Sequence, residues 1–190
     1  MKNIVIFASG SGTNAENIAN YFNLHKNIKI TYILSNKKDA FVLERAKKFN
    51  IPTLVFDRHQ FYETNGIVDF LKEQKTDFIV LSGFLWLVPE SLIEAFPNKI
   101  INIHPALLPK YGGKGFYGEK VHQAVIDHQE KESGITIHYV NKIYDSGTTI
   151  FQATCPVADG DTAETLAQKV HQLEYKYFPT IIEKVVLNQL

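Results

Sequence analysis

Residues 3–24 read NIVIFASGSGTNAENIANYFNL, an apolar run joined to a helical pattern by a glycine-rich break. Residues 3–8 are apolar at almost every position, as expected for a strand buried between two layers of helices. Residues 14–24 place Ile18, Ala19 and Phe22 on one face of a helix. The stretch therefore predicts a strand, a tight turn and a helix, which is the repeating unit of a parallel α/β sheet.

The same alternation continues to residue 104. Strand patterns recur at residues 28–34, 53–56, 77–81 and 99–104, with helical patterns between them at 39–49, 60–73 and 89–95. Asp39 is the predicted N-cap of the first of these helices, and Gly66 interrupts the second. Because crossovers between parallel strands are right-handed, the pattern predicts a Rossmann-like, doubly wound and mostly parallel sheet.

The pattern changes after residue 104. A loop containing Pro105 and Pro109 extends to residue 118, and a helix is predicted at 119–128. Two β-rich runs, at 134–140 and 149–157, are separated by only eight residues, which suits an antiparallel hairpin. Asp161 or Thr162 is predicted to cap a long final helix that ends near residue 187. We expect one domain over residues 1–190.

Composition excludes several classes of protein. The 190 residues contain 20 Lys and Arg and 20 Asp and Glu, so no broad basic field is available to bind nucleic acid. A single cysteine excludes an intramolecular disulfide framework, and no Cys/His cluster has zinc-site spacing, so no metal is expected. The N-terminal apolar run at 4–8 is too short for a signal peptide, and no run approaches a membrane span. We therefore expect a cytoplasmic protein without membrane contact, either a monomer or a homodimer.

The turn at Ser9–Asn14 (SGSGTN) lies between a buried strand and a helix N-terminus. Unpaired backbone N–H groups and the helix dipole can bind an anion at such a position. The turn has neither the Gly-Lys-Ser/Thr of a P-loop nor the third glycine of a dinucleotide site. A phosphate site and a tight turn with a Thr or Asn cap are about equally compatible with this spacing.

Asn102 and His104 offer an amide and an imidazole at the end of a buried strand. Alternation places both on one side, with Ile101 and Ile103 on the other. The amide can donate to an oxyanion and the imidazole can transfer protons, although a hydrogen-bonded pair of core residues would have the same pattern. Asp145 is the best candidate partner and would raise the pKa of His104, but it also fits an Asx-turn.

Four motifs together resemble the folate-dependent formyltransferase superfamily: SGSGTN at 9–14, LSGF at 81–84, NIHPALLPKY at 102–111 and DSG at 145–147. The resemblance covers essentially the whole chain. It implies a Rossmann-like sheet with folate bound in a cleft beside the fifth strand. It also implies direct transfer of a formyl group from 10-formyltetrahydrofolate to the amine of 5-phosphoribosylglycinamide, a reaction of purine biosynthesis, without a metal.

The resemblance assigns roles residue by residue. Asn102 supports a tetrahedral oxyanion, and His104, assisted by Asp145, handles protons. The ribonucleotide contacts are Gly12, Thr13, Asn14 and Glu174, of which Glu174 alone would suggest only a solvated helix face. The folate contacts are Leu85, Trp86, Leu87, Val88, Asn102, Asn141 and Asp145.

The chain departs from the family pattern at two places. Trp86 replaces a basic residue of many relatives and could wall a flat ring or simply be core. The glycine-rich loop 110–120 is longer than the common form, and no basic residue between 57 and 65 is assigned to the folate tail. Of the remaining side chains, His122, His128, His138 and His171 are expected to be solvated or hydrogen-bonded, and Cys155 a packed thiol.

Other readings remain open. Methionyl-tRNA formyltransferases usually carry a C-terminal RNA-binding domain, and 190 residues without a basic patch do not favour that enzyme. Formyltetrahydrofolate hydrolases usually carry an N-terminal regulatory domain, which is not expected here because the glycine turn starts at residue 9. The SGSGTN turn disfavours sugar-nucleotide formyltransferases. A binding module without activity would have no need of Asn102, His104 and Asp145 together.

Overall fold

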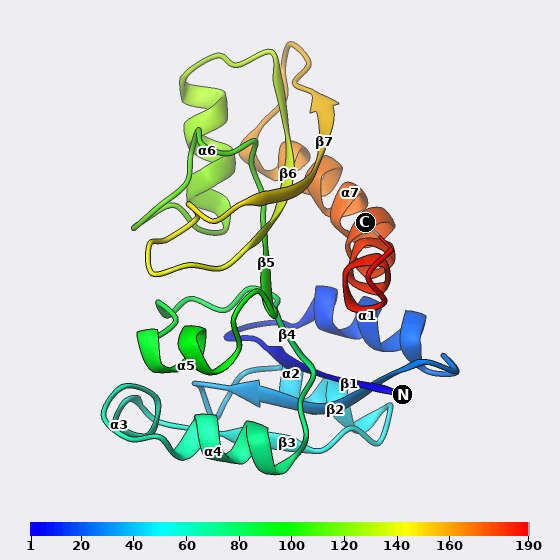
Figure 1. Ribbon diagram of the computed structural model, residues 1–190. Coiled ribbons are helices and arrows are strands. Elements are labelled where there is room, and N and C mark those ends of the chain that lie inside the picture. The colour runs from blue at the N-terminus through cyan, green and yellow to red at the C-terminus, as the bar shows by residue number, and fades with distance from the viewer. Residues whose placement is uncertain (190) are drawn as a thin grey trace.

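The computed structural model describes residues 1–189. Seven strands form one sheet in the order β3-β2-β1-β4-β5-β6-β7 (Figure 1). The strands are β1 (Lys2–Phe7), β2 (Ile28–Ser35), β3 (Thr53–Val55), β4 (Phe78–Leu81), β5 (Ile100–His104), β6 (Glu132–Tyr139) and β7 (Thr149–Pro156). The helices are α1 (Thr13–Phe22), α2 (Val42–Lys47), α3 (Arg58–Tyr62), α4 (Gly66–Glu73), α5 (Glu90–Ala95), α6 (Glu119–Asp127) and α7 (Ala163–Val186).

The first five strands run parallel to one another, and β6 is antiparallel to both of its neighbours, β5 and β7. The predicted mostly parallel, doubly wound sheet with an antiparallel C-terminal pair is therefore confirmed. From β3 the chain crosses back to place β4 on the other side of β1. Connections leave β1 and β4 in opposite directions, which opens a crevice at their carboxyl ends, where doubly wound folds bind ligands.

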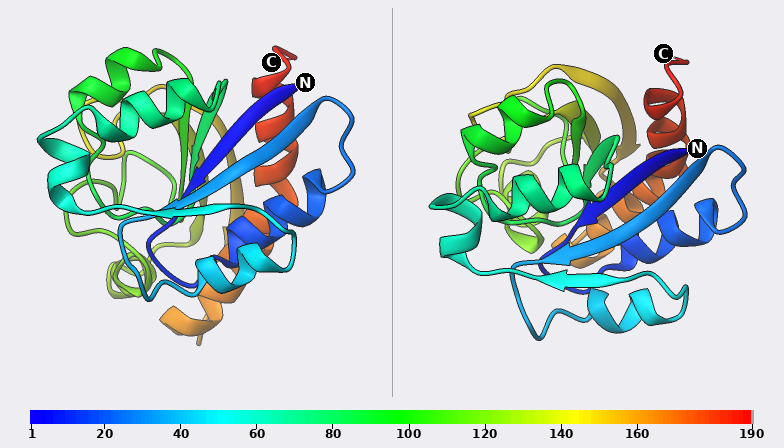
Figure 2. Two further views of the ribbon diagram at one scale, coloured as in Figure 1. Left: turned by 90° about the horizontal axis from the view of Figure 1, so that it is seen from below. Right: turned by 60° about the horizontal axis from the view of Figure 1, so that its bottom comes forward.

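Alternate residues of the parallel strands pack against opposite helix layers. Ile4 and Ile6 belong to the core formed with α1, α2 and α7. Val5 and Phe7 belong to the core formed with α3, α4 and α5. Both views in Figure 2 show the sheet between these two sets of helices. Burial on both faces explains why the β1 sequence is continuously apolar.

Two of the predicted helices differ in the structure. Asp39 does not cap α2: the helix begins at Val42 with Phe41 at its N-cap, and Val42 N donates to the Gly10 carbonyl of the glycine turn. The helix predicted at residues 60–73 is two helices, α3 and α4, with Gly66 opening the second. Asp57 caps α3 by accepting from Gln60 N, so the first of the pair starts earlier than predicted.

The C-terminal part of the chain adds the edge strand β7 to the sheet and then returns to the first helix, α1. Thr162, not Asp161, caps α7, since its hydroxyl accepts from Thr165 N. The helix then runs back to pack against α1 (Figure 1). In the β6–β7 connection, a Cβ on Gly147 would overlap the Tyr139 carbonyl, so this glycine lets the loop fold close to β6. No helix within residues 1–189 is long and apolar enough to cross a membrane.

Candidate active site

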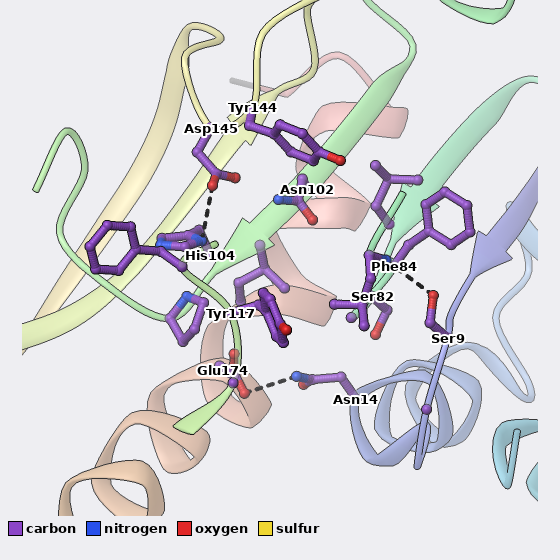
Figure 3. A pocket seen from close by; sticks show the side chains of 18 of the residues that line it. Ser9, Asn14, Ser82, Phe84, Asn102, His104, Tyr117, Tyr144, Asp145 and Glu174 are labelled. Atoms are coloured by element: carbon purple, nitrogen blue, oxygen red, sulfur yellow. Dashed lines mark hydrogen bonds and ion pairs between the residues drawn. The ribbon is translucent and has the colours of Figure 1, made fainter. Parts of the chain in front are cut away.

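A cavity of about 1010 Å³ lies at the carboxyl ends of β1, β4 and β5. Its walls come from the turn after β1, the segment after β4, the end of β5, the β6–β7 loop and α7 (Figure 3). Every predicted site residue lines it: Gly12, Thr13, Asn14, Leu85, Trp86, Leu87, Val88, Asn102, His104, Asn141, Asp145 and Glu174. The fold thus gathers residues separated by up to 162 positions around one space.

The glycine turn forms one end of the cavity. Gly12 has φ 74°, a left-handed conformation that favours glycine, and a Cβ there would overlap Val42. Its carbonyl accepts from Glu16 N, so α1 begins directly after the turn with its N-terminus at the cavity. Ser9 fixes the turn to the next wall, because its hydroxyl donates to Asn36 Oδ1 and accepts from Leu85 N.

Glu174 on α7 joins this end of the cavity to the turn. The residue is only 4% exposed, so the helix face on which it lies is not solvated. Oε2 accepts from Asn14 Nδ2 at 2.9 Å (Figure 3). The same oxygen accepts from His171 Nδ1 at 2.7 Å. The hydrogen bond to the carboxylate raises the pKa of His171. Asn14 and Glu174 are therefore held in place by contact with each other across the cavity wall.

The two ring nitrogens of His104 have different surroundings. Nε2 lies 2.7 Å from the Tyr111 carbonyl oxygen, which can only accept, so Nε2 carries a proton. Nδ1 faces Asp145 Oδ2 at 3.5 Å, longer than a direct hydrogen bond (Figure 3). Burial lowers the pKa of His104, and the nearby Asp145 carboxylate only partly offsets that effect. Asp145 raises the pKa of His104 as expected, but burial is the larger cause, so the net shift is downward and not upward.

Asp145 is held by the loops on both sides of it. It has a left-handed φ of 53°, and its Oδ2 accepts from Gly113 N at 2.9 Å. Burial alone would raise the pKa of Asp145, but the polar groups around the carboxylate, among them the Gly113 N–H, keep it below its usual range. Asp145 is therefore an ionised carboxylate beside a neutral imidazole, and it favours any positive charge that develops on His104.

Asn102 is oriented by a histidine on the neighbouring strand. β5 and β6 pair so that Asn102 is directly opposite His138. His138 Nδ1 lies 2.8 Å from the Tyr139 carbonyl oxygen and so carries the proton, which leaves Nε2 to accept from Asn102 Nδ2 at 3.2 Å. His138 Nε2 and Asp145 Oδ1 are 3.7 Å apart, too far for a hydrogen bond. The second Asn102 N–H remains for a ligand.

The opposite wall is aromatic and aliphatic. Trp86 is half-buried, with ring centroids of Phe61 and Tyr62 both 5.8 Å away, so it is part of a packed cluster as well as of the cavity lining. Tyr62 Oη donates to the Leu87 carbonyl and holds the segment that follows β4. Asn141 Oδ1 accepts from Ile143 N and Ser146 Oγ, so its side chain shapes the β6–β7 loop.

Three histidines that line the cavity were expected only to be solvated or hydrogen-bonded: His122, His138 and His171. His138 and His171 are hydrogen-bonded, but His122 is buried, and within residues 1–189 its Nδ1 has no partner. His138 could be found only from the β5–β6 register, which the hairpin prediction does not specify. The contact between His171 and Glu174 could have been predicted, because a spacing of three residues places both on one helix face. Among residues 1–189, no group of three or more His, Cys, Asp or Glu side chains is placed to hold a metal ion.

Comparison with known proteins identifies relatives over almost the whole chain. The formyl transferase family model matches residues 2–182. A chloroplastic phosphoribosylglycinamide formyltransferase of Arabidopsis thaliana is 40% identical over 187 residues, covering 95% of this chain and 64% of that protein. A phosphoribosylglycinamide formyltransferase of Bacillus subtilis (strain 168) is 34% identical over 192 residues, covering 98% of this chain and 95% of that protein.

Solved structures share the fold. The crystal structure of phosphoribosylglycinamide formyltransferase from Anaplasma phagocytophilum matches with a TM-score of 0.89 at 32% identity, covering 98% of this chain and 88% of that chain. The crystal structure of glycinamide ribonucleotide transformylase 1 from Symbiobacterium toebii matches with a TM-score of 0.90 at 31% identity, covering 99% of this chain and 89% of that chain. The chain spans only 64% and 60% of the two plant proteins, from Arabidopsis thaliana and Vigna unguiculata.

Proposed function

Because the chain belongs to the formyl transferase family, we propose that it transfers the formyl group of 10-formyltetrahydrofolate to the amine of 5-phosphoribosylglycinamide. The product is formylglycinamide ribonucleotide, so the protein acts in de novo purine biosynthesis. The names of the Bacillus and Anaplasma relatives support this substrate. The observation that carries the proposal is the meeting of Asn102, His104 and Asp145 at one end of β5, inside a cavity that also contains the glycine turn.

The ribonucleotide occupies the end of the cavity beside α1. Its phosphate lies against the backbone N–H groups of Gly12, Thr13 and Asn14, where the positive end of the α1 dipole favours an anion. Glu174 receives the ribose, because a carboxylate accepts hydrogen bonds from hydroxyl groups and repels phosphate. The ligand amine is then directed toward the carboxyl end of β5.

The folate occupies the other end. Leu85, Trp86, Leu87 and Val88 provide an apolar wall for the flat pterin ring, and the loop containing Asn141 and Asp145 supplies polar contacts at its edge. A cavity of about 1010 Å³ has room for two ligands of this kind. The formyl group lies between the two halves, beside Asn102 and His104.

His104 manages the protons through Nδ1. The amine attacks the formyl carbon, and neutral His104 accepts the proton that the new C–N bond releases. The proton passes from His104 to the folate nitrogen as the bond between that nitrogen and the formyl carbon breaks. Asp145 stabilises the imidazolium between the two steps, since the two groups are 3.5 Å apart. The low pKa of His104 keeps the base neutral at the start.

Asn102 stabilises the negative charge on the formyl oxygen. One N–H of its amide is bonded to His138 Nε2, so the second can donate to the oxyanion without reorienting. Preorganised donors of this kind contribute about 2.7–4 kcal/mol in other acyl-transfer enzymes. The proposed transfer is direct and involves no metal. The proposed location is the cytoplasm.

A formyl-transfer assay tests the proposal. Purified protein is incubated with 10-formyltetrahydrofolate, with and without phosphoribosylglycinamide, and both tetrahydrofolate and the formylated ribonucleotide are measured. Turnover that requires the ribonucleotide is expected. Release of formate without it would indicate a hydrolase, and no turnover with either mixture would refute the proposed reaction. His59→Ala, on the exposed side of α3, serves as a matched control for cavity variants because His59 does not line the cavity.

A further inference from the structure

His122 is a buried cavity residue to which the proposed mechanism gives no task. It lies on α6, which packs against α7, and its side chain is only 3% exposed. Within residues 1–189, its Nδ1 has no hydrogen-bond partner. Nε2 also forms no hydrogen bond with these residues, but unlike Nδ1 it is not fully enclosed by them, so in this cavity wall Nε2 is the ring nitrogen that a ligand can contact.

The ring is neutral, and its proton can be assigned. Burial lowers the pKa of His122 to about 4, and the neighbouring His171 acts in the same direction. A buried N–H without an acceptor is rarer in proteins than a buried acceptor without a donor. The neutral ring therefore leaves Nδ1 unprotonated and carries its proton on Nε2. Nε2–H is then the one ring N–H that a ligand in the cavity can use.

The surroundings of His122 suit a hydroxyl group and not an anion. Glu174 is close enough to act on the pKa of His122, and its negative charge repels a phosphate. Glu174 Oε2 already accepts from Asn14 and His171, which leaves Oε1 for a ligand donor. Asn14 Oδ1 is a second buried atom that has no partner among residues 1–189. A hydroxyl can both donate to such acceptors and accept from His122.

We infer that His122 determines sugar specificity: Nε2–H donates to one ribose hydroxyl of the substrate while Glu174 accepts from the diol. The inference rests on the proposed function, because it takes the ligand to be a ribonucleotide. It adds a donor on α6 to the acceptors on α1 and α7. A sugar that lacks the hydroxyl leaves Nε2–H without its ligand acceptor and is bound more weakly.

Direct binding tests the assignment independently of turnover. Phosphoribosylglycinamide and its 2′-deoxy and 3′-deoxy analogues are titrated calorimetrically into wild type, His122→Leu and His122→Gln. Wild type should bind the ribonucleotide at least about tenfold more tightly than one of the deoxy analogues. His122→Leu should lose most of that preference, and His122→Gln, whose amide N–H replaces Nε2–H, should keep part of it. Affinity for 10-formyltetrahydrofolate should not change.

The outcomes separate the inference from the proposed reaction. An equal loss of affinity for all three sugars in His122→Leu, or no loss, would overturn the role of His122 even if formyl transfer is observed. Sugar preference that depends on His122 without formyl transfer would refute only the reaction. Failure of wild type to bind any of the three would overturn both. Thermal unfolding of each variant checks that it is folded. His122→Leu should be no less stable than wild type at pH 7, because within residues 1–189 His122 Nδ1 has no hydrogen bond to lose.

Discussion

His104 is bonded to the Tyr111 carbonyl on one side and faces the Asp145 carboxylate on the other. The carbonyl fixes which nitrogen is protonated in the neutral ring, and the carboxylate stabilises the charged ring. Burial and Asp145 shift the pKa in opposite directions, and burial prevails. The outcome is an imidazole that is neutral near pH 7 and that, in the proposed mechanism, is protonated during the reaction.

Replacing His104 removes this base. His104→Ala should lower kcat by at least about a hundredfold, which is the contribution expected of general acid–base catalysis, with little change in the KM of either substrate. Steady-state kinetics with both substrates varied measures the effect, and His59→Ala should match wild type. A kcat within severalfold of wild type in His104→Ala would remove the proposed role.

The pH dependence of the reaction reports on the same pair. The acid limb of kcat/KM should lie below pH 6.5, because His104 must be neutral and burial lowers its pKa. Asp145 raises the pKa of His104, so Asp145→Asn should move this limb to still lower pH. It should also reduce kcat by about tenfold or more, since a loss of about 1.4 kcal/mol on the transition state is one factor of ten. A limb that shifts to higher pH in Asp145→Asn would contradict the proposed electrostatics.

The sequence was informative about residues on one strand and uninformative about residues on different elements. Period-2 alternation was enough to place Asn102 and His104 together. The partner of Asn102, His138, depends on the register of an antiparallel pair, and nothing local to either strand specifies that register. Asp145 reaches His104 only because Gly147 lets its loop fold against β6, which no periodicity encodes.

The glycine turn links three elements. It ends β1, opens α1 and, through the Gly10 carbonyl, receives the first N–H of α2. The apolar runs of the strands made them predictable, because burial on both faces requires such runs. The start of α2 was not predictable: contact with the turn sets it, and Asp39 three residues earlier is a good capping residue that goes unused.

The two glycines of the turn should respond differently to the same substitution. Gly12→Ala puts a methyl group into Val42 at a left-handed φ, and should lower the free energy of unfolding by about 1–3 kcal/mol. It should also raise KM for the ribonucleotide far more than for the folate, because the N-terminus of α1 moves. Gly10→Ala has open space around its Cβ and should leave the stability nearly unchanged. Denaturant unfolding and kinetics measure both; equal effects of Gly12→Ala on the two KM values would count against the phosphate site.

For the whole protein, the buried histidines couple stability to pH. His104 and His122 have lowered pKa values in the folded state, so between their folded values and about pH 6.5 the unfolded chain binds more protons. Their contribution to stability is present above pH 6.5 and is lost as the pH falls. His171 has a raised pKa, so its contribution changes only above pH 6.5.

Stability measured between pH 6.5 and 4.5 should therefore fall less in His122→Leu than in wild type. Above pH 4.5 the carboxylates with lowered pKa values, such as Asp145 and Asp161, stay ionised and do not obscure the comparison. Urea unfolding at several pH values gives the two slopes. Parallel pH dependence in the two proteins would show that His122 does not titrate in the way its burial requires.

The hydrogen bond between Asn14 and Glu174 joins residues 160 positions apart, near the two ends of the chain. Closing so long a loop is costly in entropy, so we expect this contact to form late in folding, after the local contacts of the helices and strands. Enzymatic activity is consequently a measure of finished folding. During refolding from denaturant, the far-ultraviolet signal of the helices should recover first, and catalysis should return last.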